Sequence, residues 1–154
     1  MNNRKIRATA AAFAIASATL AGGFAGIAPA TAAPAVVRTA APSVGELQAK
    51  LQVLLNTGAS RSARAAELEA GEAGLPMIDQ IAGVMNSVPS FRWSVQGPVS
   101  VNGDTLSANL MTTVDGFSPF PAIEVSWRRI DGTWKLTRES ECTIGYYASV
   151  PCSV

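Results

Sequence analysis

The 154-residue chain contains no histidine, and this absence limits the chemistry open to it. Ser-His-Asp and Cys-His catalysis and histidine metal sites all need an imidazole. Two cysteines remain, Cys142 and Cys152, both close to the C-terminus. In an oxidising compartment we expect them to form a disulfide with each other. Zinc is the weaker alternative, because two thiols leave it short of ligands. The sequence therefore predicts no metal site and no cofactor.

Carboxylates offer the remaining route to acid or base catalysis, and this would require an acid on an apolar face. Glu124 falls on the outward register of a predicted strand, and Asp79 flanks the apolar stripe of a predicted helix. Other acids fall at turns, namely Asp104, Asp115 and Asp131. We therefore predict no catalytic residue.

Five aromatic residues have the spacing to line an apolar cavity between a sheet and helices: Trp93, Phe117, Phe120, Trp127 and Trp134. Such a cavity suits a small apolar ligand. The alternative is that these rings fill the core, as aromatics at strand period usually do. The segment 117–121 places Phe117 and Phe120 beside two prolines, so it predicts a stiff loop that is either a contact site or a lid.

Tyr146 and Tyr147 lie between the two cysteines. A disulfide-held loop with adjacent tyrosines can form a preorganised recognition surface. The alternative is a tail that packs back on its own sheet.

Cross-strand ion pairs are also predicted. We expect Arg128, Arg129 and Arg138 to pair with Glu124, Glu139 or Glu141.

Three helices are predicted ahead of every strand. Ser43 and Glu46 form a capping-box pattern before an apolar stripe that ends at Asn56-Thr57-Gly58. A second short helix is predicted over 60–70, and a third begins near Pro76 and ends at Pro89.

From Phe91 onward apolar and polar residues alternate, which indicates strands. Asn102-Gly103 and Asp131-Gly132 mark hairpin turns. Helices followed by strands predict an α+β domain, with three N-terminal helices packed on a curved four-stranded antiparallel meander.

The N-terminus has the pattern of a secretory signal peptide. Three cations within the first seven residues precede an uncharged, small-residue stretch that ends at Ala32. Cleavage removes three of the 12 basic residues and none of the 11 acidic ones, so the mature net charge is −2. We predict a signal peptide over 1–32, an Ala/Pro linker over 33–42 and one domain over 43–154. Scattered cations argue against nucleic acid, and cleavage leaves no transmembrane anchor.

Three segments carry a family resemblance: Pro42–Leu47 with Leu54-Leu55-Asn56, Ser90–Val95, and Gly132–Arg138. Their order and spacing behind a signal peptide resemble the low-molecular-weight secreted antigen family of mycobacteria and related actinobacteria. The tail from Glu141 to Val154 departs from the family pattern. The resemblance implies a cone like that of nuclear transport factor 2, related to the cystatin-like folds, and it assigns no catalytic residue.

Together these features predict a secreted or envelope-associated, non-enzymatic antigen-like protein. We expect it to bind either a small apolar ligand or a partner protein. The alternative is an isomerase or cyclase on the same fold, which would require a buried acid facing an enclosed cavity. A structural module without a pocket is the third reading.

Overall fold

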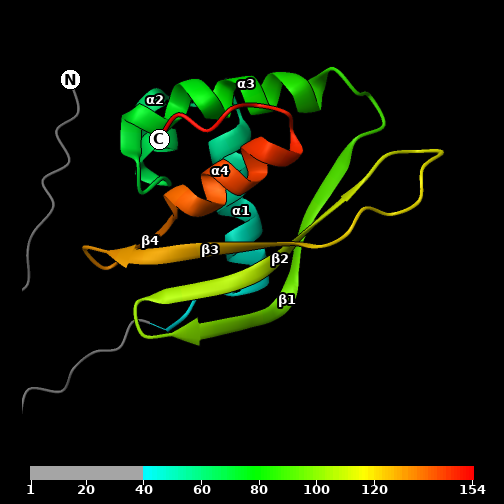
Figure 1. Ribbon diagram of the computed structural model, residues 1–154. Coiled ribbons are helices and arrows are strands. Elements are labelled where there is room, and N and C mark those ends of the chain that lie inside the picture. Colours follow the sequence, from blue (N-terminus) through cyan, green and yellow to red (C-terminus); the bar gives the residue numbers. More distant parts are fainter. Residues whose placement is uncertain (1–39) are drawn as a thin grey trace, which may run out of the picture. The chain divides into compact units, whose positions relative to one another are not determined.

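The computed structural model describes residues 40–154 as an α+β fold with one four-stranded antiparallel sheet and four α-helices (Figure 1). Three α-helices precede the first strand, and the fourth follows the last. The predicted signal peptide, and the predicted linker as far as residue 39, lie outside the described residues.

Helix α1 (Val44–Leu55) begins as the sequence predicts. The Ser43 hydroxyl accepts a hydrogen bond from the Glu46 N–H, and the Glu46 carboxylate accepts one from the Ser43 N–H at 2.7 Å. This capping box satisfies amides that a helix start would otherwise leave free. The apolar stripe then faces inward, since Leu47, Leu51 and Leu54 are buried.

The second predicted helix is shorter than expected. Helix α2 (Arg61–Ala66) ends before residue 67, because residues 67–69 run alongside strand β4 (Thr133–Leu136). The Leu136 N–H donates to the Glu67 carbonyl (2.8 Å), and the Glu69 N–H donates to the Leu136 carbonyl (2.9 Å). Leu68 between them is fully buried, so core packing replaces the helix that local propensity favours. A 3-10 helix, η1 (Gly71–Gly74), then leads into α3 (Leu75–Asn86).

The sheet is a meander in the order β1-β2-β3-β4, as the sequence predicts. Its other strands are β1 (Arg92–Asn102), β2 (Thr105–Thr113) and β3 (Ile123–Ile130). The β3-β4 turn places Asp131 and Gly132 at φ 51° and 77°. Two positive φ values in a two-residue loop match the twist of the flanking strands, which explains the Asp-Gly sequence.

The pairing of β2 with β3 stops at Leu110 and Ile123. Residues 111–113 of β2 continue to pair with β1, whereas the chain from 114 to 122 leaves the sheet. Pro119 and Pro121 lie in this loop and have no N–H to donate to a ladder. The sheet is therefore open between β2 and β3 at this end.

Helix α4 (Arg138–Tyr147) was not predicted. It packs on β3, where the Ser126 N–H donates to the Ser140 hydroxyl at 2.7 Å. Figure 1 shows α3 and α4 on the same side of the sheet. The expected picture of three N-terminal helices on the sheet was therefore incomplete, since a C-terminal helix covers β3.

The chain after α4 folds back on that helix. The Val150 N–H donates to the Gly145 carbonyl at 2.8 Å, and Val150 is buried. Cys142 and Cys152 lie at disulfide distance, with their Cα atoms 4.9 Å apart, in agreement with the expected pairing. The part of the tail within α4 thus packs on the sheet, as the alternative interpretation held, and the residues after α4 pack on that helix.

Both outer strands of the sheet are covered along part of their free edges. At the β1 edge, Gln48 of α1 accepts a hydrogen bond from the Val95 N–H at 2.6 Å. At the β4 edge, residues 67–69 occupy the backbone groups of Leu136. No helix within residues 40–154 is long and apolar enough to cross a bilayer.

Candidate functional site

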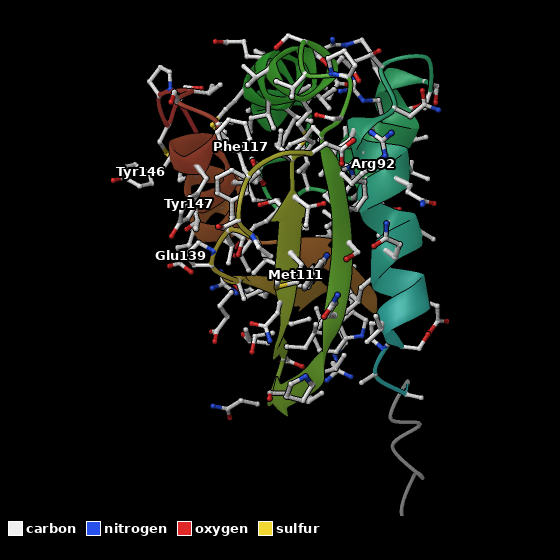
Figure 2. The ribbon with its side chains drawn as sticks, turned by 90° about the vertical axis from the view of Figure 1, so that its right-hand side faces the viewer. Arg92, Met111, Phe117, Glu139, Tyr146 and Tyr147 are labelled. Atoms are coloured by element: carbon white, nitrogen blue, oxygen red, sulfur yellow. A yellow bond between two sulfur atoms is a disulfide. The ribbon has the colours of Figure 1, made fainter. Side chains whose placement is uncertain are left out.

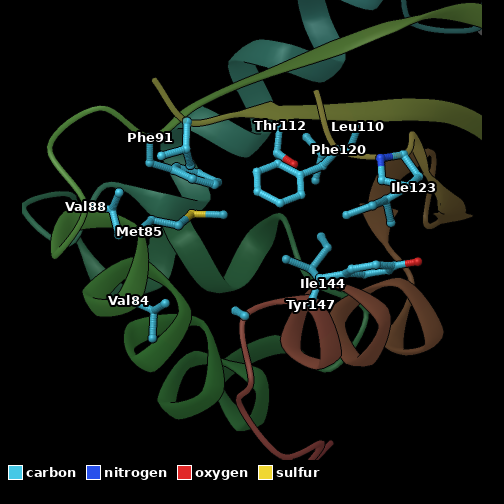
Figure 3. A pocket seen from close by; sticks show the side chains of 13 residues that line it. Val84, Met85, Val88, Phe91, Leu110, Thr112, Phe120, Ile123, Ile144 and Tyr147 are labelled. Atoms are coloured by element: carbon cyan, nitrogen blue, oxygen red, sulfur yellow. The ribbon is translucent and has the colours of Figure 1, made fainter. Parts of the chain in front are cut away.

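A pocket of about 250 Å³ lies where the sheet is open (Figure 3). Its walls are the end of α3, the segment between α3 and β1, the end of β2, the loop after β2, the start of β3, and α4 with the residue that follows it. The lining residues are Val84, Met85, Val88, Phe91, Leu110, Thr112, Val114, Phe120, Pro121, Ile123, Ile144, Tyr147 and Ala148.

The local sequence explains why this space is not filled. Residues 114–122 leave the sheet, so no strand residue covers the gap beyond Ile123. Helix α3 supplies Val84 and Met85, and the segment between α3 and β1 supplies Val88 and Phe91. Figure 3 shows Met85, Phe120 and Ile144 approaching the central space from three different elements. The pocket is therefore a product of the fold rather than of one loop.

The lining is apolar and uncharged. Eleven of its thirteen side chains carry no polar atom able to form a strong hydrogen bond, and none carries a charge. The two exceptions are Thr112 and Tyr147. Figure 3 shows the Tyr147 hydroxyl pointing away from the pocket while its ring lies beside it. Thr112 is thus the polar side chain that faces the interior.

Of the five aromatic residues predicted to line a cavity, Phe120 alone lines this pocket. Trp127 and Trp134 are 1% and 6% exposed and belong to the core, and Trp93 packs against that core while partly buried. Phe117 is 70% exposed. The tryptophans therefore fill space, as the alternative interpretation held. Sequence reasoning missed Met85, Leu110 and Ile144, because their apolar character also fits an ordinary core.

The two predicted recognition residues differ in position. Tyr146 is 79% exposed and lies outside the pocket, whereas Tyr147 forms part of its wall. Their rings meet edge to face with centroids 5.6 Å apart. Figure 2 shows both on the α4 side of the molecule. They belong to the last turn of a helix rather than to an irregular loop.

Glu141 is the buried acid that sequence reasoning missed. Its side chain is fully buried on α4, and Oε1 accepts a hydrogen bond from the Ala70 N–H at 3.4 Å. Oε2 has no hydrogen-bond partner in the described part of the chain. Burial raises the pKa of Glu141 to about 7, and the nearby Glu69 adds to this, whereas the Ala70 amide and Arg138 oppose it. Glu141 does not line the pocket, so it cannot act on a molecule bound there.

The expected cross-strand ion pairs were wrong. Arg128 pairs with Glu69 at 2.5 Å, and Arg129 pairs with Asp104. Arg138 bonds Glu69 through its backbone N–H. Arg129 thus reaches the β1-β2 turn on one side of β3, whereas Arg128 and Arg138 reach Glu69 on the other side. Within residues 40–154, no three acidic or cysteine side chains cluster closely enough to hold a metal ion.

Comparison with known proteins agrees with the resemblance seen in the sequence. The family described as "Low molecular weight antigen MTB12, C-terminal domain" matches residues 40–152. This range includes most of the tail from Glu141, which was expected to depart from the family pattern. No curated protein matches the chain. With about three quarters of its length matched, the chain belongs to the family of the low molecular weight antigen MTB12 C-terminal domain.

Proposed function

We propose that the protein is a secreted or envelope-associated binding domain that holds a small apolar ligand in the pocket between α3, α4 and the open end of the sheet. The observation that carries the proposal is the uncharged, apolar lining contributed by separate elements of the fold. Apolar concave sites with few polar groups are typical of small-molecule binding. The antigen family and the cysteine pair support a location outside the cytoplasm.

The same proposal includes a cone of the nuclear transport factor 2 kind, with the sheet as its wall and the pocket at its mouth. Support comes from the antiparallel sheet with α3 and α4 on one side. A non-enzymatic role is the better reading, because the pocket lining contains no acid, base or nucleophile suited to isomerase chemistry.

A partner protein is the second candidate, and one observation favours it. Phe117 and Tyr146 are large, strongly exposed and outside the pocket. Aromatic residues of this kind are enriched at protein interfaces.

Native mass spectrometry of the protein secreted by a host that expresses the full chain tests the proposal. The native mass is compared with the mass of the same sample after denaturation. We expect the native mass to exceed the denatured mass by that of one small organic molecule, which solvent extraction should recover. A bare chain that also binds no apolar probe would overturn ligand binding and favour the partner protein.

A further inference from the structure

The size of the pocket limits the size of its occupant. An engineered apolar protein cavity of about 150 Å³ is known to hold benzene, which has six heavy atoms. At the same volume per atom, a pocket of about 250 Å³ holds a ligand of about ten heavy atoms. A bicyclic ring system fits this volume, whereas a long acyl chain would extend far into solvent.

The lining also limits the charge of the occupant. No lysine, arginine, aspartate or glutamate contributes to the pocket wall. An ionised group placed inside would lose its hydration without gaining a counter-charge, and this is strongly unfavourable. The site therefore selects against carboxylates, phosphates and ammonium groups.

Thr112 supplies a single point of polar recognition. It is 9% exposed and lies on the inward register of β2, two residues after Leu110. Figure 3 shows its side chain directed from the strand toward the space beside Phe120. A threonine hydroxyl offers one donor and two acceptor positions, so it can bond either a hydroxyl or a carbonyl of the ligand.

We infer that the pocket takes a compact, uncharged ligand of about ten heavy atoms whose one hydrogen-bonding group meets Oγ1 of Thr112. This inference rests on the proposed function, and it names the chemical class of ligand that the same site accepts.

Three probes of similar ring size test the class: naphthalene, 2-naphthol and 2-naphthoate. Their binding to the purified secreted protein is measured by ligand-observed NMR titration at neutral pH. We expect 2-naphthol and naphthalene to bind and 2-naphthoate to bind at least about 100-fold more weakly than 2-naphthol. Equal binding of 2-naphthoate would overturn the inference of an uncharged ligand while leaving the pocket as the site.

The role of Thr112 is tested with Thr112→Val, which keeps the shape and removes the hydroxyl. We expect this variant to bind 2-naphthol about three- to tenfold more weakly, which corresponds to the loss of one hydrogen bond. Its affinity for naphthalene should stay within about a factor of two of the wild-type value. Thr113→Val is the matched control, because Thr113 is exposed and the register of β2 points it away from the pocket. An unchanged affinity of Thr112→Val for 2-naphthol would overturn the assignment.

The outcomes separate this inference from the proposed function. If no naphthalene probe binds and native mass spectrometry still finds a retained small molecule, the ligand class is wrong and the binding function stands. If neither a probe nor a retained molecule is found, both are wrong.

Discussion

Glu141 of α4 and Gly74 of η1 are in such close contact that a Cβ on residue 74 would lie 2.5 Å from Oε2 of Glu141. Leu68 and Ala70 close the same space, at 3.0 and 3.2 Å from that position. The backbone of Gly74 is ordinary, with φ −76° and ψ −22°, so the close approach rather than the conformation requires glycine.

Gly74→Ala should therefore destabilise the protein by about 1–3 kcal/mol, because the added methyl overpacks a buried carboxyl. Urea unfolding measures the change. Gly83→Ala is the control, since Gly83 lies inside α3 with nothing within 4 Å of its Cβ position and should gain up to about 1 kcal/mol. Equal effects at the two glycines would contradict the close contact.

The buried carboxyl of Glu141 should make stability fall as pH rises. Its folded-state pKa of about 7 lies above its ordinary value of 4.5, so the folded state binds more protons than the unfolded state between these values. The stabilising contribution is complete below about pH 4.5 and is lost as pH rises through 7, a total of up to about 3 kcal/mol.

Glu141→Gln should remove this dependence, because an amide stays neutral. Urea midpoints between pH 4.5 and 8 would show a flatter profile for the variant, which becomes the more stable protein at pH 8. Glu139→Gln, an exposed position on the same helix, should keep the wild-type slope. The same slope in all three proteins would show that Glu141 does not titrate in this range.

The disulfide should stabilise the fold chiefly by restraining the unfolded tail. Cys142 and Cys152 are ten residues apart, and closing such a loop is worth about 2.5–3 kcal/mol in the chain-entropy treatment. The double variant Cys142→Ser/Cys152→Ser should lose this amount in thermal or urea unfolding. Reductant should lower the stability of the wild type by the same amount and leave that of the double variant unchanged. A loss of stability of the double variant in reductant would show that the reductant acts on something other than this disulfide.

Filling the pocket should abolish binding of 2-naphthol. Val84 is 42% exposed on the rim, so Val84→Trp can place its indole in the cavity without disturbing the core. Val101→Trp is the matched control, because Val101 is 52% exposed on β1 and outside the pocket. Titration should show loss of binding in the first variant alone, and retained binding in Val84→Trp would place the probe at another site.

Several elements could be predicted because their signals are local. The Ser43 capping box and the Asp131-Gly132 turn depend on residues close in sequence, and both are present. The alternation of Ile123, Val125 and Trp127 likewise predicts the buried face of β3.

Helix α4 could not be found from hydropathy. Its buried face carries Ser140, Glu141, Ile144 and Gly145, of which only Ile144 is a large apolar residue. Thr137 as N-cap and two acids in the first turn were the available signals. An apolar cavity between sheet and helices was predicted, but most of its lining was not, since one wall belongs to α4 and the gap depends on where β2 and β3 separate.

The covered edges of the sheet bear on how this protein behaves at high concentration. A sheet with free edges offers rows of N–H and C=O groups to which a strand of another molecule can add. Here Gln48 occupies the Val95 N–H on one side, and residues 67–69 pair with Leu136 on the other. Pro98, further along β1, has no N–H to offer. These contacts reduce the number of edge groups to which a strand of another molecule could add.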